Sequence, residues 1–573
     1  MAAVAALVIL AAFAIAFRTY ARFLGERVYG DGDDLVTPAH AQEDGVDFVP
    51  TPRPVLFGHH FTSVAGAAPI IGPCVAAYWG WAPALAWVVL GTIFLGAVHD
   101  FGALVVSVKE GGQSIAAVAA RVVSGRARLL FLCFVVVLVW LVLAVFAMAI
   151  AGLFVAQPAS VLPIWIEVVI ALAIGLAIRR GKTGHFVPSV VALVLLYVFV
   201  WVGTKVPIDL GALLGDPGQA RNVWVVVLLA YAAVASLLPV WLLLQPRDYI
   251  NSHQLFVGLG ALYLGLLVAH PDFDAPAFRS PGDDAPPIVP ILFVTIACGA
   301  ISGFHGLVSS GTSSKQLDRL RDARLVGYGA MLGEGTLALA STLAAVAGIG
   351  LVGACALPGQ GAVDDLGWHV YYDSWAHAGA NKAAAFVLGG GAFLEALGLP
   401  TALARTVMAV LVISFAATTL DTATRIQRFL VAELGEALSV PALKRPELGT
   451  ALAVFPAALL AFAETTDASG ASKQVGWVLW PIFGASNQLL AALTLLVLAL
   501  WVAQKKRPVA PLLVPMVLVT TVALVALVVK LRTFVATGNL LLAGLSALLL
   551  GLGLWMLVEG ALALRRLRRA PAG

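Results

Sequence analysis

The chain has 573 residues, of which 61% are hydrophobic and only 12% are charged. Soluble domains usually carry about 25% charged residues, so this chain has too few charges to cover a water-soluble surface of its size. The composition therefore excludes a soluble enzyme, a disordered protein and a nucleic-acid-binding module. Together with a mean hydropathy of +0.96, it predicts an all-α polytopic membrane protein.

Apolar stretches long enough to cross a bilayer recur along the whole chain. A helix needs about 20 apolar residues to cross the hydrocarbon core. We predict about 15 spans, or 16 if the short stretch 383–397, which a run of three glycines interrupts, crosses fully. The candidate spans are residues 2–17, 61–79, 83–108, 127–155, 161–180, 185–204, 222–245, 253–269, 288–308, 325–353, 401–422, 449–463, 475–501, 509–530 and 538–564.

The positions of Lys and Arg orient these spans, because basic residues collect in cytoplasmic loops. If the N-terminus lies outside, the loops around Arg121 and Arg319 fall inside, as does the C-terminal tail around Arg566. The acidic loop at Asp272 then falls outside. The pattern predicts an outer N-terminus, an inner C-terminus and a stretch 383–397 that does not cross fully.

One stretch, residues 57–73, contains residues that a plain lipid-facing helix avoids. Pro69 and Pro73 each remove a backbone donor, and Gly66 and Gly72 lower the cost of unwinding. Unwound backbone at membrane depth is tolerated only where it lines a cavity or is buried in protein. The pattern is typical of the discontinuous helices of transporters, with a Pro-kinked packing helix as the alternative. We predict a substrate cradle at this break, formed by Ser63, Gly66, Ala67, Ala68 and Pro69.

A second candidate break lies at residues 236–249, which include Pro239 and Pro246. It follows the first break by five spans and runs in the opposite direction in the predicted topology. This is the relation expected of inverted repeats, in which two corresponding broken helices form one site. We therefore predict that Ser236 and Pro239 contribute to the same cradle.

Small and hydroxyl-bearing residues crowd a third stretch, 299–316. They allow helices to approach closely, and their oxygens offer ligands for a cation or donors for a carboxylate. Packing alone explains them equally well. A fourth stretch, 480–488, carries Asn487 and Gln488, which serve either interhelical bonding or substrate contact. The candidate ligands of the third stretch are Ser302, Ser309, Ser310 and Thr312.

Ionisable residues at membrane depth are rare, because each charge at a helix centre costs about 2.5–3.5 kcal/mol on insertion scales. Such residues pair with one another or carry protons and ions. The histidines are also explained as packing residues, or as a metal site. The candidates for proton coupling are His60, His99, Asp100, His305 and Glu334.

Asp421 and Arg425 lie four residues apart, a spacing that suits an ion pair on one helical face. The sequence contains no nucleotide-binding motif, so ATP-driven transport is not expected. We expect no catalytic residue, no bound metal and no cofactor, with a proton, or alternatively a sodium ion, as the coupling ion.

Five motifs in this chain closely resemble signatures of one membrane protein family, the carbon starvation protein A (CstA) family. The motifs are long and specific, and the resemblance extends from about residue 50 to about residue 500. They are residues 57–73, 91–101, 309–317, 419–425 and 480–488.

The resemblance implies a bacterial inner-membrane transporter of the amino acid–polyamine–organocation superfamily. Such a transporter would import pyruvate or short peptides by proton symport under nutrient limitation. The resemblance also implies a LeuT-like core of two inverted five-helix repeats with broken helices. Residues 1–56 would form an N-terminal span and cytoplasmic segment, 57–430 the transporter core, and 431–573 additional spans. The N-terminus would be periplasmic and the C-terminus cytoplasmic.

Two alternatives from other classes stay open. One is a nutrient sensor that keeps a transporter-like fold. The other is an intramembrane metalloprotein that uses the cluster of His59, His60, His99 and His305. The expected partners are the lipid bilayer and a small solute, either pyruvate or a peptide, and no nucleic acid.

Overall fold

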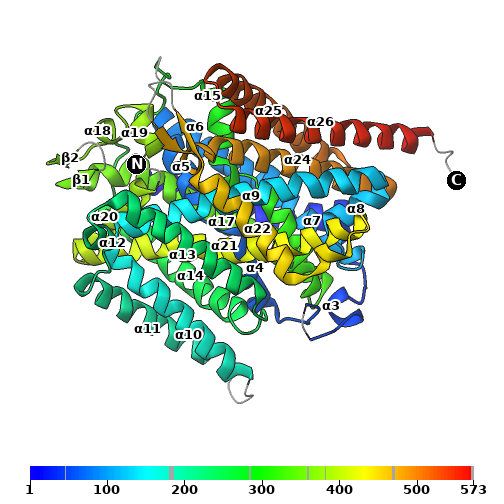
Figure 1. Ribbon diagram of the computed structural model, residues 1–573, viewed down its shortest axis with the longest axis horizontal. Helices are drawn as coiled ribbons and strands as arrows, with labels where there is room; N and C mark the ends of the chain where they lie inside the picture. The colour runs from blue at the N-terminus through cyan, green and yellow to red at the C-terminus, as the bar shows by residue number, and fades with distance from the viewer. Residues whose placement is uncertain are drawn as a thin grey trace.

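A computed structural model of the chain describes residues 1–45, 47–179, 186–282, 285–357, 361–380, 383–466 and 472–569. Within these ranges, 13 helices are long and apolar enough to cross a membrane, and a bent helix pair forms one further span. The helices lie roughly side by side along one direction (Figure 1). The predicted all-α polytopic membrane fold is confirmed.

Two short β-hairpins accompany the helices in the described ranges: β1 (Cys355–Leu357) pairs with β2 (Gly361–Val363), and β3 (Glu464–Thr466) pairs with β4 (Ser472–Gln474). The longer helices are α1 (Ala2–Arg18), α4 (Arg53–Val64), α5 (Ala68–Ala76), α6 (Trp81–Gly91), α7 (Ala97–Lys109), α8 (Ile115–Val122), α9 (Gly125–Ala156), α10 (Val161–Arg179), α11 (Phe186–Lys205), α13 (Pro217–Leu237), α14 (Leu244–Ala269), α15 (Ile288–Ile296), α16 (Gly303–Gly311), α17 (Ala330–Leu343), α20 (Ala384–Glu395), α21 (Thr401–Ala437), α22 (Pro446–Phe462), α24 (Trp480–Gln504), α25 (Ala510–Ala536) and α26 (Leu540–Arg569).

Two short apolar helices decide the number of spans. Helix α22 has 17 residues and a length of about 26 Å, close to the thickness of the hydrocarbon core. Counting α22 and the bent pair with the long helices gives the fifteen spans that the sequence predicts. Helix α20 corresponds to the doubtful stretch 383–397 and has only 12 residues, or about 18 Å. It is too short to cross, as the distribution of basic residues predicts.

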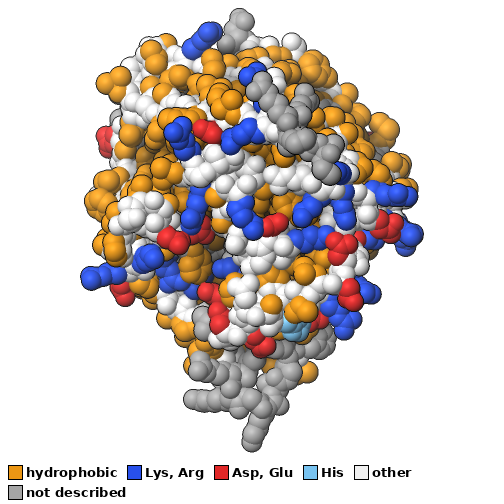
Figure 2. All heavy atoms as spheres, turned by 90° about the vertical axis from the view of Figure 1, so that its right-hand side faces the viewer, with side chains coloured by type: hydrophobic (Ala, Val, Ile, Leu, Met, Phe, Trp, Pro, Cys, Tyr) orange, Lys and Arg blue, Asp and Glu red, His pale blue; other side chains and the backbone are white. Residues whose placement is uncertain are grey.

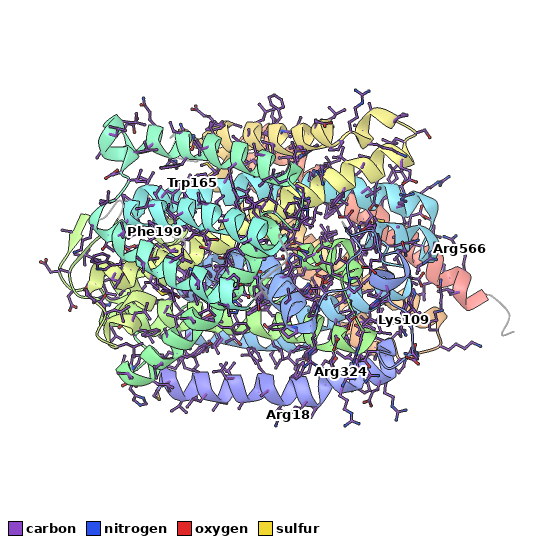
Figure 3. All side chains as sticks on the ribbon, turned by 90° about the horizontal axis from the view of Figure 1, so that it is seen from below. Arg18, Lys109, Trp165, Phe199, Arg324 and Arg566 are labelled. Carbon is purple, nitrogen blue, oxygen red and sulfur yellow. The ribbon has the colours of Figure 1, made fainter. Side chains whose placement is uncertain are left out.

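Basic side chains gather at one end of the bundle, which we call the basic end. Figure 2 shows Lys and Arg side chains spread over this end, and Figure 3 places Lys109, Arg324 and Arg566 toward it. Lys109 pairs there with Asp33, and Arg324 with Asp31. The two termini lie at opposite ends (Figure 1). This polarity agrees with the sorting of basic loops to one side of the membrane.

The packing of the helices repeats within the bundle. Helix α5 packs on α17 as α16 packs on α7, α9 on α13 as α21 on α22, and α4 on α14 as α15 on α24. The long helices α9 and α21 pack on each other at the centre. Two inverted five-helix repeats produce this pattern, with the hairpin of α10 and α11 outside both. We therefore propose that the second repeat extends through α24, so that the core ends near residue 504 rather than at residue 430.

Close backbone contact between the two repeats generates a prediction about stability. A Cβ atom added at Gly72 in α5 would lie 2.4 Å from the carbonyl oxygen of Thr295 in α15, and backbone cannot move aside cheaply. We expect Gly72→Ala to lower the free energy of unfolding by about 1–3 kcal/mol, measured as a lower melting temperature in detergent. Gly260→Ala is the matched control, because a Cβ there meets nothing within 4 Å. Equal melting temperatures for the two variants would contradict the close contact.

Candidate functional site

The first predicted break is present. Helix α4 ends at Val64, α5 begins at Ala68, and the two halves meet at an angle of 46°. The amide of Ala65 keeps the last helical bond, to the carbonyl of Phe61, whereas the amide of Gly66 bonds to the carbonyl of Val64 instead. Gly66 also approaches α21, since a Cβ added there would lie 2.6 Å from Thr419 Oγ1. The break is buried in protein, which is the condition under which membrane-depth unwinding is tolerated.

A second break lies between α15 and α16, within the hydroxyl-rich stretch. Helix α15 ends at Ile296, Ala297 adopts a φ of 33°, and α16 begins only at Gly303. The two broken helices run antiparallel, because His60 bonds to Ser313 at one end while Gly72 meets Thr295 at the other. This register brings the two breaks to the same depth.

The prediction of an interrupted span at residues 236–249 is wrong. Helix α13 ends at Leu237 and α14 begins at Leu244, and each is a full span of its own. Pro239 therefore lies in the connection between two spans. Ser236 bonds to the carbonyl of Ala233 and to Thr450. Proline marks a loop between spans as readily as a break within one, so the pattern alone did not separate the two.

Side chains from neighbouring helices bond to main-chain groups around the second break. Asn487 Oδ1 accepts a hydrogen bond from the amide of Phe304 at 2.9 Å, in the first turn of α16. Gln488 Nε2 donates to the carbonyl of Phe293 at 2.7 Å, and Thr92 Oγ1 donates to the carbonyl of Gly299 at 3.2 Å. Asn487 and Gln488 thus make interhelical bonds, one of the two roles that their position in an apolar span predicts.

The predicted hydroxyl ligands divide into two groups. Ser302 lies in the second break and bonds to Asn487, while Ser310 and Thr312 bond to carbonyls one turn earlier in the chain. Ser63, beside the first break, and Ser309 are fully buried, and their hydroxyls lack a hydrogen-bond partner in the described part of the chain. A buried hydroxyl without a partner is costly, so these two are available to a bound solute or ion.

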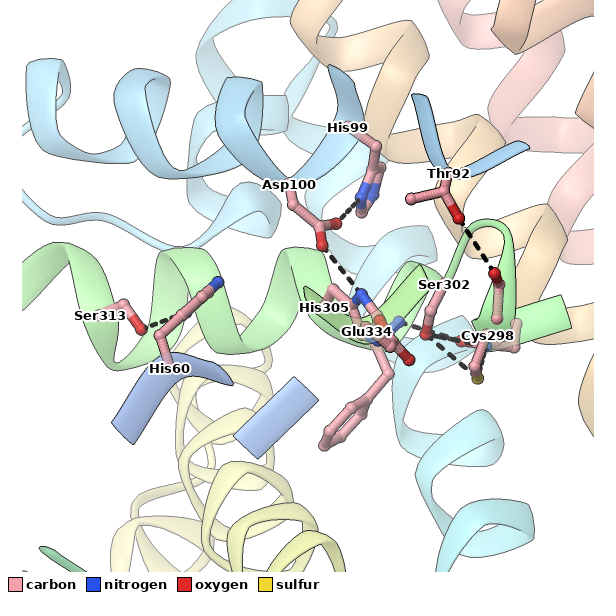
Figure 4. A network of polar contacts seen from close by, with 12 residues as sticks. His60, Thr92, His99, Asp100, Cys298, Ser302, His305, Ser313 and Glu334 are labelled. Carbon is pink, nitrogen blue, oxygen red and sulfur yellow. Dashed lines mark hydrogen bonds and ion pairs between the residues drawn. The ribbon is translucent and has the colours of Figure 1, made fainter. Parts of the chain in front are cut away.

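Four of the five predicted proton-coupling residues form one buried cluster beside the second break (Figure 4). His305 Nδ1 lies 2.9 Å from Asp100 Oδ2, and His305 Nε2 lies 3.3 Å from Glu334 Oε2. His99 Nδ1 lies 2.7 Å from Asp100 Oδ1. His99 and Asp100 lie in α7, His305 in α16 and Glu334 in α17. The cluster therefore links α7 of the first repeat to α16 and α17 of the second.

The position of His305 between two carboxylates has a chemical consequence. His305 bonds to Asp100 through Nδ1, while its Nε2 lies at ion-pair distance from Glu334, whose carboxylate oxygens lack a hydrogen-bond partner among the described residues. A protonated His305 would place one positive charge between two ionised carboxylates. That arrangement carries a net charge of −1, and one further proton neutralises it. Because unpaired charge is costly in a membrane interior, the cluster can hold and release a proton as its surroundings change.

His60, the fifth predicted residue, faces Ser313 at 2.7 Å rather than the carboxylates (Figure 4). His59 pairs with Asp248 of α14 at 2.6 Å. Among the described residues, no group of three or more His, Cys, Asp or Glu side chains is arranged to hold a metal ion. Of the four histidines of the metalloprotein alternative, His99 and His305 share Asp100, whereas His59 and His60 bond to Asp248 and Ser313.

Sequence reasoning missed a second buried charge cluster, centred on Arg247 of α14. Arg247 Nε lies 3.0 Å from Glu167 Oε1, and its Nη1 lies 2.6 Å from Asp421 Oδ2 and 2.7 Å from the hydroxyl of Tyr231. The four side chains come from α10, α13, α14 and α21. The spacing in the sequence paired Asp421 with Arg425 instead. The sequence feature that points to this cluster is Glu167, a lone carboxylate within an apolar span.

The burial of Arg247 yields a prediction about folding. Removing it leaves Glu167 and Asp421 buried without a counter-charge, which typically costs about 3–5 kcal/mol. We expect Arg247→Met to lower the melting temperature and the yield of folded protein strongly, whereas the exposed control Arg445→Met does not. A melting temperature for Arg247→Met equal to that of the control would show that the ion pairs contribute nothing.

The chain is similar in sequence to several proteins of known name. The chain is 32% identical to the peptide transporter CstA of Mycobacterium tuberculosis, over 86% of this chain and 70% of the relative. It is 33% identical to the pyruvate/proton symporter BtsT of Escherichia coli, over 86% of this chain and 76% of the relative.

Among solved structures, the crystal structure of a mutant of the manganese transporter of Eremococcus coleocola covers 91% of this chain and 99% of its own, with 11% identity and a TM-score of 0.44. The family model described as carbon starvation protein CstA matches residues 1–526. The chain therefore belongs to the carbon starvation protein CstA family.

Proposed function

We propose that this protein is a secondary transporter of the bacterial inner membrane that imports a small carboxylate such as pyruvate, or a short peptide, together with protons. One observation carries the proposal: two antiparallel helices are broken at the same depth, beside a buried cluster of histidine and carboxylate side chains. The names of the relatives, a peptide transporter and a pyruvate/proton symporter, supply the two solute classes.

The solute would bind between the breaks. The half-helices α5 and α16 begin there, and the positive ends of their dipoles attract an anionic group such as a carboxylate. The buried hydroxyl of Ser63, which lies next to the end of α4, is free to donate to the same group. In alternating access, the halves α4 and α16, which pack on each other and lead to the basic end, would move to open the site on that side.

Proton coupling would use Asp100, His305 and Glu334. A proton that enters the cluster neutralises its net negative charge, and this lowers the cost of moving the site through the membrane interior. Sodium is the alternative coupling ion. The basic end would face the cytoplasm, which places the N-terminus in the periplasm and the C-terminus in the cytoplasm.

Counterflow in proteoliposomes tests the proposed function. Vesicles loaded with unlabelled pyruvate, another monocarboxylate or a dipeptide should take up the same labelled solute, and an inward proton gradient should increase its accumulation. A sensor with the same fold would bind a solute without any counterflow. Neither counterflow nor accumulation for any of these solutes would contradict a transport function.

Two conservative substitutions test the coupling mechanism. We expect Asp100→Asn and Glu334→Gln to abolish accumulation driven by a pH gradient, because an amide cannot take up a proton. Counterflow needs no net proton movement and should continue in both variants. Glu26→Gln, which changes an exposed carboxylate, is the matched control. Full pH-driven accumulation in both variants would overturn the assignment of these residues.

A further inference from the structure

A cavity of about 780 Å³ opens at the basic end of the bundle, away from the breaks. It lies between Gly45, the segment 47–52, the first turns of α4, the connection from α13 to α14 and the last turns of α21. Pro239, predicted from the sequence to bind substrate, lines this cavity rather than the break. His59 also lines it, six residues before the first break, which is about 9 Å along the helix. The cavity therefore leads toward the proposed solute site.

Two arginines of α21, Arg425 and Arg428, line the cavity. Arg425 is almost fully buried, and its Nη2 donates to the carbonyls of Ala235 and Leu238 at the end of α13. Its Nε lacks a hydrogen-bond partner among the described residues. Main-chain carbonyls thus fix the position of this guanidinium without neutralising its charge.

Arg428 lies one turn further along the same face of α21. Its guanidinium carbon lies 5.0 Å from the ring centre of Phe429. In the part of the chain that the structure describes, neither Arg425 nor Arg428 has a carboxylate within ion-pair distance. Asp47 is the one acidic residue among the described residues that line the cavity. Asp248, Asp421 and Glu447 act on the two arginines from outside the lining. The lining itself therefore carries two guanidinium groups and one carboxylate.

We propose that Arg425 and Arg428 form a carboxylate-binding site in the cytoplasmic vestibule, which receives the anionic group of the solute as it leaves the central site. This inference rests on the proposed function. Pyruvate and peptides share a carboxylate and little else, and a guanidinium binds a carboxylate through two parallel hydrogen bonds. One such site therefore serves both solute classes.

The proposed site acts on solute from one side of the membrane only, so membrane vesicles of opposite orientation test it. It lies at the basic end, so it acts on solute from the cytoplasmic side. We expect Arg428→Gln to raise the half-saturation concentration for labelled pyruvate about 10-fold in inside-out membrane vesicles, the effect of losing one charge-assisted hydrogen bond. In right-side-out vesicles the same variant should behave as the wild type.

Matched variants separate charge from structure. Arg428→Lys keeps the charge but loses the two parallel guanidinium hydrogen bonds, so its half-saturation concentration should rise, but less than that of Arg428→Gln. Arg445→Gln removes an exposed charge at the same end, outside the cavity lining, and should change nothing. Arg428 is the better position for substitution, because Arg425 also holds the end of α13 and its loss could disturb folding. Equal melting temperatures for Arg428→Gln and the wild type confirm that the variant is folded.

The outcomes distinguish the vestibule site from the transport function. If the wild type transports pyruvate and Arg428→Gln is unchanged, or is impaired equally from both sides, the vestibule site is wrong and the transport function stands. If the wild type transports neither pyruvate nor a dipeptide, the transport function itself fails. A negative lipid headgroup is the other source of an anion. An effect of Arg428→Gln that appears in phosphatidylglycerol liposomes and vanishes in phosphatidylcholine liposomes would overturn the solute assignment.

Discussion

A main-chain group that a helix break frees cannot be solvated by lipid, and the architecture around both breaks follows from this constraint. At the second break, Thr92 and Asn487 supply partners for the carbonyl of Gly299 and the amide of Phe304 from helices of both repeats. Gln488 adds a second bond to the carbonyl of Phe293, which also accepts from the amide of Ala297. Each bond places a polar side chain in an otherwise apolar span. The breaks and their polar neighbours therefore form one unit, and a solute that binds between them meets main-chain groups that are already held in place.

The buried charges follow a related rule, because an ion in the membrane interior needs a counter-ion. The Arg247 cluster and the His305 cluster satisfy this requirement in different ways. Arg247 is bound by Glu167, Asp421 and Tyr231 and joins four helices, an arrangement suited to a fixed structural element. His305 stands between two carboxylates in a group whose charge changes with a single proton. The second arrangement is the one expected of a coupling site.

Much of the fold was predictable, because span length and loop charge are local properties of the sequence. The first break was predictable for the same reason, since Gly66 and Pro69 mark it directly. The second break was assigned to Pro239, because a proline in a loop and a proline in an interrupted span look alike in sequence. The individual members of the proton cluster were predictable as ionisable residues in apolar spans. The partners of Arg247 were not predictable, because Glu167 and Asp421 are 80 and 174 residues away in the sequence and only tertiary packing brings them together.

The central claim is that a solute binds between the two breaks. A cryo-electron microscopy map of the protein in nanodiscs, with a saturating concentration of pyruvate or a dipeptide, tests it most directly. The account predicts solute density between residues 65–67 and 300–302, within hydrogen-bond distance of main-chain atoms of both segments. Continuous helices through either segment, or solute density only at another place in the bundle, would contradict it.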